Sequence, residues 1–482
     1  MQLVKLITLK RINALRCFFL IFPVLVFTAF SPVFSQDNSP YSRYGIGDLV
    51  PSTNIINRSM GGVTAAYSDI YSINFNNPAS FSSLQGISEL KSKKLSAGRA
   101  VLDVGINFES RSLKEPATSK TFVASNALFS YVYVGVPLKS NWGLSFGLRP
   151  VSRISYKQFR SERLVDPLTG LPIDSAITRF EGNGGSYLAS IGTGFSLFQR
   201  MKNGRKGEDS AKLIGQEKLS FGITGGYMFG KKDYSTRRTL VNDSVQYNQG
   251  NYQTKTNFGG LSVNLGLQYK LPLTRLMMLH LGAYGNLGNE LNATQDVLRE
   301  TFVFDPSAGD VRQDSVSDLK NVKGKLKLPS SYTFGFLLQK LAVINKEGGW
   351  MFGIDFMTQK WEDYRFYDQS DMLRNKWELR VGGSLNPTPK RNYFSNVTYR
   401  FGFFTGPDYV EVGNKLPQYG GTFGIGLPFA SSRTAQNQVT LLNLAFEYIK
   451  RGNNDNVLRE NMFRISLGLS LSDYWFIKRK YD

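Results

Sequence analysis

From about residue 99 to the C-terminus, apolar and polar residues alternate along the chain with a period of two. The clearest run is 261–271, where Leu, Val and Tyr alternate with Ser, Asn, Gly, Gln and Lys, and 442–448 and 463–472 repeat it. This alternation is typical of β-strands that have one apolar face. The other face is built of Gly, Ser, Asn and Gln, which suits a polar lumen. The pattern therefore favours a transmembrane antiparallel β-barrel over a soluble sandwich, whose apolar face would point inward.

About fourteen such segments can be marked, and an even number is what a bacterial single-chain barrel requires. The predicted strands are 99–112, 121–137, 141–159, 184–198, 216–231, 252–271, 276–292, 326–341, 347–362, 375–386, 396–406, 418–430, 437–450 and 461–476. Aromatic residues recur near their ends, where the interfacial girdles of a membrane barrel would lie. They are Tyr131, Tyr133, Trp142, Trp350, Trp361, Trp377, Tyr474, Trp475 and Phe476.

The connections between these strands differ in length according to parity. Those after odd-numbered strands include the long polar stretches 160–183, 232–251 and 293–325. Those after even-numbered strands are mostly tight, and 199–215 is the exception. Outer-membrane barrels have short periplasmic turns and longer external loops. The parity predicts that both termini lie in the periplasm.

Residues 1–35 read as a signal peptide. Four basic residues precede a short apolar stretch, 17–30, and small residues then lead to a predicted cleavage site between Ser35 and Gln36. An N-terminal membrane anchor is the alternative. It is disfavoured because the apolar stretch is shorter than the roughly 20 residues that span a bilayer. We expect export to the outer membrane of a Gram-negative bacterium.

Composition excludes most site chemistry in the predicted mature chain. Its only cysteine, Cys17, leaves with the signal, and His280 is the only histidine. Thiol, zinc and Ser-His-Asp chemistry therefore have almost nothing to build on, and we expect neither an enzyme nor a cofactor nor a bound metal. The formal charge of +21 becomes +17 when the four basic and no acidic residues of 1–35 are removed. The basic residues are scattered, which favours anionic lipids and lipopolysaccharide over nucleic acid as partners.

Residues 57–80 read NRSMGGVTAAYSDIYSINFNNPAS. This segment resembles the N-terminal hatch of the FadL/TodX family, outer-membrane transporters of long-chain fatty acids and aromatic hydrocarbons. The resemblance implies a hatch over 36–98 inside the lumen of a barrel over 99–482. The matching residues are Arg58, Gly61, Gly62, Ala65, Ala66, Asp69, Asn77, Pro78 and Ala79.

Elementary backbone chemistry fits this placement. Pro78 fixes its own φ and keeps Asn77 out of the helical region, so the pair sets a turn. Gly61 and Gly62 allow backbone to pass close to neighbouring elements. Family members release ligand sideways through a kink in the third strand. The third predicted strand here contains Pro150, which marks either a bulge or break in pairing or simply a strand end near the rim.

The resemblance implies transport of a hydrophobic small molecule, such as a long-chain fatty acid, by hatch-gated lateral diffusion. It places the gate at Arg58, Gly61, Gly62 and 77–79, with the opening at Pro150. The alternative is a non-transporting barrel that serves as an accessory or docking subunit of an outer-membrane secretion or assembly complex, with other outer-membrane proteins as partners. High positive charge and the long 293–325 connection keep this alternative open, because a fold does not fix a function.

Overall fold

The computed structural model describes residues 39–88, 95–118, 120–203, 213–241, 247–305, 307, 309–429 and 438–475. The predicted signal peptide lies outside the described residues. Within them, no helix is both long and apolar enough to cross a membrane.

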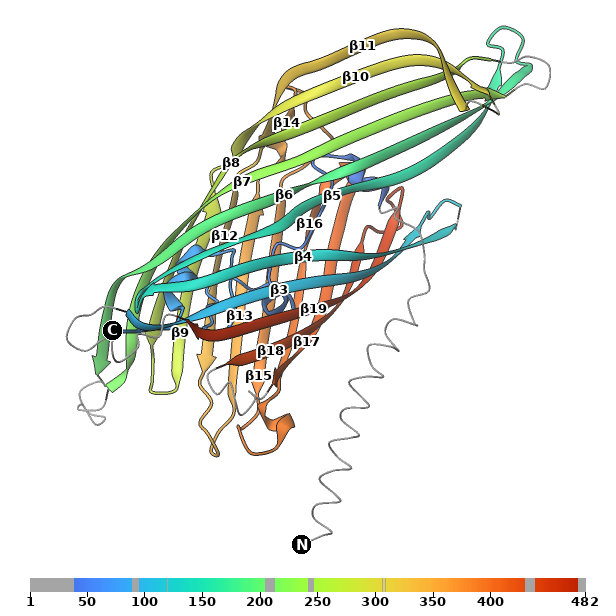
Figure 1. Cartoon of the computed structure of the whole chain (residues 1–482). Helices are drawn as coiled ribbons and strands as arrows, with labels where there is room; N and C mark the ends of the chain where they lie inside the picture. The colour runs from blue at the N-terminus through green and yellow to red at the C-terminus, as the bar shows by residue number, and fades with distance from the viewer. Residues whose placement is uncertain are drawn as a thin grey trace, which may run out of the picture.

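The described chain forms one closed antiparallel barrel of fourteen wall strands, as the sequence predicted (Figure 1). Each strand pairs with the next, and β19 pairs with β3 to close the wall. Two of the fourteen are interrupted strands, β9 with β10 and β11 with β12. The wall strands are β3 (Leu95–Lys114), β4 (Thr121–Lys139), β5 (Trp142–Val165), β6 (Pro172–Asn203), β7 (Leu213–Val241), β8 (Gln249–Pro272), β9 (Met277–Asn286), β10 (Asn289–Asp305), β11 (Gly309–Leu328), β12 (Ser331–Lys340), β13 (Gly349–Gln359), β15 (Lys376–Asn386), β16 (Thr398–Val412), β17 (Asn414–Phe429), β18 (Val439–Arg451) and β19 (Arg459–Trp475).

The three long connections predicted as polar loops are wrong, because 160–183, 232–251 and 293–325 are mostly strand. They extend β5–β6, β7–β8 and β10–β11 into a sheet that projects beyond the rest of the barrel (Figure 1). The strands were missed because they carry polar residues on both faces, so they lack the apolar alternation by which strands are recognised.

Apolar side chains face outward along the lower wall. In β8, Leu261 is 74% exposed and Val263 is 51% exposed, whereas Gln268 is buried. An outward apolar band on a closed barrel is the architecture of an outer-membrane protein. Of the residues predicted for the girdles, Trp142 and Trp377 are exposed, whereas the prediction is wrong for three inward-facing residues. Tyr131, Tyr133 and Trp361 are buried.

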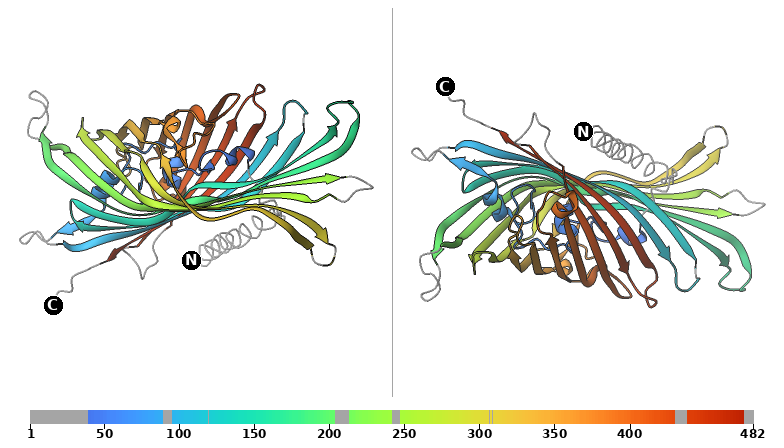
Figure 2. Two further views of the ribbon diagram at one scale, coloured as in Figure 1. Left: turned by 90° about the horizontal axis from the view of Figure 1, so that it is seen from above. Right: turned by 90° about the horizontal axis from the view of Figure 1, so that it is seen from below.

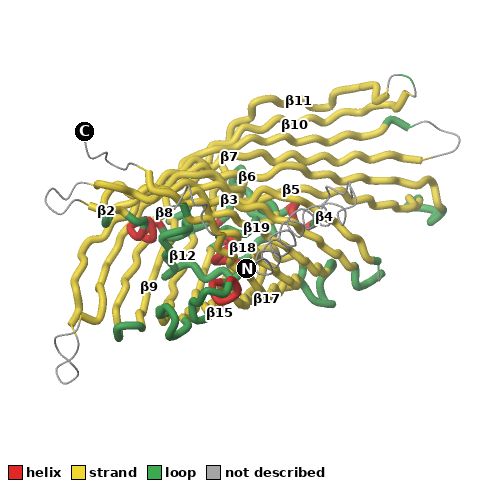
Figure 3. Tube along the Cα trace, turned by 60° about the horizontal axis from the view of Figure 1, so that its bottom comes forward, coloured by secondary structure: helices red, strands yellow, loops and turns green. Residues whose placement is uncertain are grey.

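The N-terminal part of the described chain lies inside the wall (Figure 2). It is mostly irregular, and the few short helices of Figure 3 include its own. It is buried nearly throughout from 53 to 67 and from 72 to 82. Its short elements are η1 (Pro40–Arg43), β1 (Asp48–Leu49), α2 (Ile55–Arg58), η2 (Pro78–Ser83) and β2 (Gly86–Ser88), and the last of these pairs with the start of β3.

Candidate functional site

Arg58 ends α2 and is 2% exposed. Its guanidinium donates to Asn107 Oδ1 at 2.6 Å on β3 and to Ser466 Oγ at 3.2 Å on β19. It also donates to the carbonyl of Thr53 within the hatch and to Ser130 on β4. A buried charge needs several such partners. Arg58 therefore links the hatch by hydrogen bonds to β3 and β19, the two strands whose pairing closes the barrel.

Gly61 and Gly62 lie where the hatch backbone meets the wall, and both have positive φ (66° and 86°). The N–H of Gly61 donates to Thr422 Oγ1 at 2.9 Å on β17. A Cβ on Gly402 of β16 would lie 2.0 Å from Gly61 N, which leaves no room for a side chain. Backbone contacts backbone here because glycine stands on both sides.

Asn77 caps η2, and its Oδ1 accepts from Ala79 N. Its Nδ2 donates to Ala65 O at 2.6 Å within the hatch, and to the carbonyls of Leu267 on β8 and Ala283 on β9. Pro78, which follows, lies against glycines of β6 and β7. The turn thus fills the lumen beside these strands, and the residues of the predicted gate are all held tightly to the wall.

A buried charge cluster includes Asp48 near the start of the hatch. Asp48 of β1 pairs with Arg111 at 2.6 Å and with Arg451 at 3.0 Å, and both arginines also pair with Glu460. Burial alone would raise the pKa of Asp48. The two arginines outweigh it and lower the pKa of Asp48 to about 2. This carboxylate therefore stays ionised and holds the N-terminal segment to β3 and β18.

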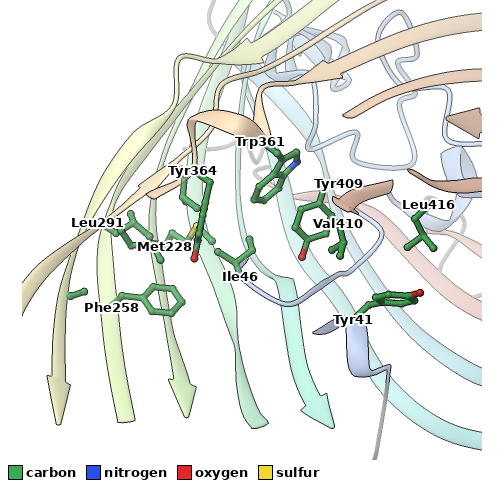
Figure 4. Packing of buried hydrophobic residues seen from close by; sticks show 13 residues of the cluster. Tyr41, Ile46, Met228, Phe258, Leu291, Trp361, Tyr364, Tyr409, Val410 and Leu416 are labelled. Carbon is green, nitrogen blue, oxygen red and sulfur yellow. The ribbon is translucent and has the colours of Figure 1, made fainter. Parts of the chain in front are cut away.

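An apolar cluster packs against the same segment (Figure 4). The ring of Trp361 packs on that of Tyr409 with centroids 4.4 Å apart. Tyr364 donates through its hydroxyl to the carbonyl of Gly45, and Tyr409 donates to the carbonyls of Tyr44 and Gly47. The N-terminal segment 44–48 is thus fixed by apolar packing as well as by ion pairs.

The wall is interrupted between β4 and β5. These strands pair from Lys139–Trp142 only as far as Val132–Leu148, and beyond that point the described pairs of β5 are with β6 and β1. Against β6, the register of β5 shifts by one residue between Pro150 and Ser152. A bulge bends its strand, and a proline has no N–H to donate to a neighbouring strand. In Figure 1, β5 rises with the projecting sheet while β4 stays with β3.

Two cavities flank this interruption. A groove of about 760 Å³ is lined by 127–129 of β4 together with parts of β5, β6, β7 and β8. A lumenal cavity of about 290 Å³ is lined by the 46–53 stretch of the hatch and by the inner face of the wall. Val50, Leu128 and Arg153 line both. We call these three residues the neck.

The lumenal cavity is strongly charged. Its lining includes eight basic residues and five acidic ones. Arg153 reaches across the interruption and donates to Asn126 Oδ1 of β4 at 3.2 Å, while its other terminal nitrogen has no partner within the described structure. Arg149 lies over the ring of Phe75. The space therefore favours a negative charge. Residues 72–82 of the hatch are buried and do not line it.

The sequence indicated Pro150 but missed the neck. Val50 and Leu128 have no distinctive pattern, and Arg153 is one of many scattered cations. They come together only because the bulge at Pro150 separates β5 from β4. A basic residue close behind a proline in a predicted third strand was the one available signal.

Comparison with solved structures shows the same fold. A Pseudomonas aeruginosa FadL homologue matches with a TM-score of 0.51 and 12% identity over 90% of this chain and 100% of that one. The Pseudomonas putida toluene transporter TodX matches with a TM-score of 0.46 and 15% identity over 89% and 99%. No curated protein matches. The resemblance to FadL-type barrels is thus confirmed for the fold.

A family model described as BamG matches residues 16–208 and 211–482, which is nearly the whole chain. A match of this extent decides membership. The chain belongs to the BamG family.

Proposed function

We propose that this barrel passes an amphiphilic small molecule, with an anionic head and an apolar tail, sideways between its lumen and the membrane. The neck carries the proposal: Val50, Leu128 and Arg153 line both the lumenal cavity and the groove at the point where β4–β5 pairing has ended. A long-chain fatty acid has this chemistry. The solved structures titled as toluene transporters share the barrel type, although their low similarity supports the fold alone.

The charge of the path selects the head group. The lumenal lining has an excess of three positive charges, and Arg149 and Arg153 have no carboxylate partner among the described residues. A carboxylate at Arg153 would form a charge-assisted hydrogen bond. The tail would contact Leu128 of the neck and then Phe129 and Ile154 of the groove.

The contacts of the hatch distinguish a fixed part of the path from a part that can move. Arg58, Gly61, Gly62 and 77–79 form the fixed floor of the path, because each is bound to wall strands or packed against them. The gate is the contact between Arg153 and Asn126 together with Val50 behind it. Opening then needs the bond from Arg153 to Asn126 and the bond from Val50 N–H to Val151 O to break, while residues 54–82 of the hatch stay in place. Pro150 keeps the strands apart.

The test is uptake by cells that lack other fatty-acid importers and produce variants of the full chain. Leu128→Trp fills the neck and should abolish uptake of radiolabelled oleate. Leu261→Trp is the matched control, because Leu261 is 74% exposed on the outward face and lines neither cavity, and it should leave uptake unchanged.

Arg153→Gln should lower oleate uptake about 10- to 100-fold, since a hydrogen bond to a charged group contributes about 1.5–3 kcal/mol. Uptake of oleyl alcohol, which has no charge, should change less than twofold. Equal uptake by Leu128→Trp and Leu261→Trp would overturn the lateral path, and equal losses for acid and alcohol would overturn the role of Arg153.

A second candidate, an accessory subunit of an outer-membrane complex, is favoured by the projecting sheet. The upper parts of β5 and β11 are largely exposed on both faces, with Phe159 at 64% and Val316 at 70%. Open sheets of this kind are normally covered on one face. If this role holds, replacing 160–177 with a short turn should remove a stoichiometric protein partner from the gently purified barrel and leave oleate uptake intact. If the barrel, produced at its natural abundance, takes up oleate and purifies with no protein partner, this role is excluded.

A further inference from the structure

We infer that the edge of β4 from Thr121 to Ala127 accepts an added β-strand from a second polypeptide, an extended segment that is uncharged and apolar. The inference goes beyond lateral passage, although Asn126 and Ala127 at the end of this stretch also belong to the gate and to the groove.

The edge is open over a substantial length. Thr121–Ala127 pairs with β3 on one side, and the described β4–β5 pairs begin only at Val132. Alternate residues of a strand point their N–H and C=O groups to the same side. About half of these seven residues therefore direct both groups toward the interruption, where no described strand receives them.

The edge lacks the devices that protect edge strands. Its sequence, TFVASNA, has no charged residue, and its described pairing with β3 has no register shift in this stretch. Phe122 and Val123, on opposite faces, are 58% and 60% exposed. A long, flat, uncharged and apolar edge is the kind that pairs with another chain.

The two edges of the projecting sheet, β5 and β11, show the contrast. β11 has three register shifts against β10, and eight of its residues are charged: Asp310, Arg312, Asp314, Asp318, Lys320, Lys323, Lys325 and Lys327. Charges and bulges of this kind block strand addition. β5 faces the interruption with Lys157, Arg160 and Arg163, and its lower part is already paired with β1. The chain thus protects two edges and leaves one unprotected.

The composition of the edge determines the partner. An apolar strand buries Phe122 and Val123, whereas a charged strand would be desolvated against a stretch that offers no countercharge. A second copy of this chain fits poorly, because two barrels inserted in the same direction present their β4 edges in parallel, and the antiparallel pairing used throughout this wall is then excluded. β1, which adds to the edge of β5 within this chain, shows that a short segment can pair in this interruption.

The experiment uses the full barrel in detergent and a fluorescent peptide of seven alternating Thr and Val residues with a soluble charged tail. Fluorescence anisotropy gives its affinity, and hydrogen exchange locates it. The matched peptide has proline at its centre and cannot complete the ladder. We expect protection of the amides in Thr121–Ala127 and at least tenfold weaker binding of the proline peptide.

Two lysine variants of β4 test whether the peptide binds at Thr121–Ala127. Val123→Lys should weaken binding at least tenfold, and Ala127→Lys repeats the test on the same outward row if the first variant folds poorly. Val316→Lys on β11 is the control and should bind as the unchanged chain does. Equal binding of both peptides, protection at β5 or β11 instead of β4, or unchanged affinity in the folded lysine variants would each overturn the inference.

Discussion

A methyl group at Gly402 should push the hatch off the wall. The Cβ of Gly402→Ala would lie 2.0 Å from Gly61 N, so the hatch must retreat by about 1.4 Å to reach the 3.4 Å of ordinary contact. The neighbour is backbone and cannot rotate away. The displacement also stretches the bond from Gly61 N–H to Thr422 Oγ1, now 2.9 Å long.

The cost follows from these two effects. Overpacking in a close-packed interior costs about 1–3 kcal/mol, and a lost hydrogen bond adds about 1 kcal/mol. The free energy that keeps the hatch closed on the wall should therefore fall by about 2–4 kcal/mol. In the regime where local opening controls hydrogen exchange, amides of residues 55–66 should exchange roughly 30- to 1,000-fold faster.

The assay is hydrogen exchange with mass spectrometry on the folded barrel. Gly421→Ala on the adjacent strand β17 is the control, because a Cβ there meets nothing within 4 Å. It should leave exchange of 55–66 unchanged. If Gly402→Ala exchanges as slowly as Gly421→Ala, the hatch does not rest on the wall at Gly61 and the account of its fixed floor is wrong.

Two further predictions concern how the N-terminal segment is held. Asn77→Ala removes the cap of η2 and leaves three buried carbonyls without this donor, so exchange of 77–83 should report a loss of about 2–4 kcal/mol, whereas Asn289→Ala, at an exposed amide, should change it little. The pKa of Asp48 is lowered to about 2, so the stability it contributes is fully present above its unfolded pKa of about 3.9 and is lost as the pH falls toward 2. Urea unfolding should therefore show a steeper loss of stability between pH 4 and pH 2 in the unchanged chain than in Asp48→Asn, by about 2 kcal/mol in all, and equal slopes would contradict the ion pairing of Asp48.

The sequence predicted the membrane part of the wall closely, because lipid on one side and a polar lumen on the other impose a strict period of two. Thus 349–359 and 376–386 were expected to within a few residues. It failed for the projecting sheet, where β11 has polar residues on both faces and only pairing with β10 makes it a strand. Propensity and pattern do not carry that information.

The hatch could be recognised from its short motif, but its energetic role could not. Arg58 reads as one cation among 58 lysines and arginines, and its partners come from β3, β4 and β19. Which direction the termini face stays a prediction, and so do the domain boundaries at residues 35 and 98.

The lateral path is tested most directly by labelling with a photoreactive fatty acid. The full chain in outer-membrane vesicles is illuminated with a diazirine-bearing palmitate, and labelled peptides are identified by mass spectrometry. The account predicts labels concentrated at Val50 and Leu128, and predicts that Leu128→Trp removes the label from Val50. Labels confined to the outward apolar band, such as Leu261 and Val263, and unaffected by Leu128→Trp would contradict it.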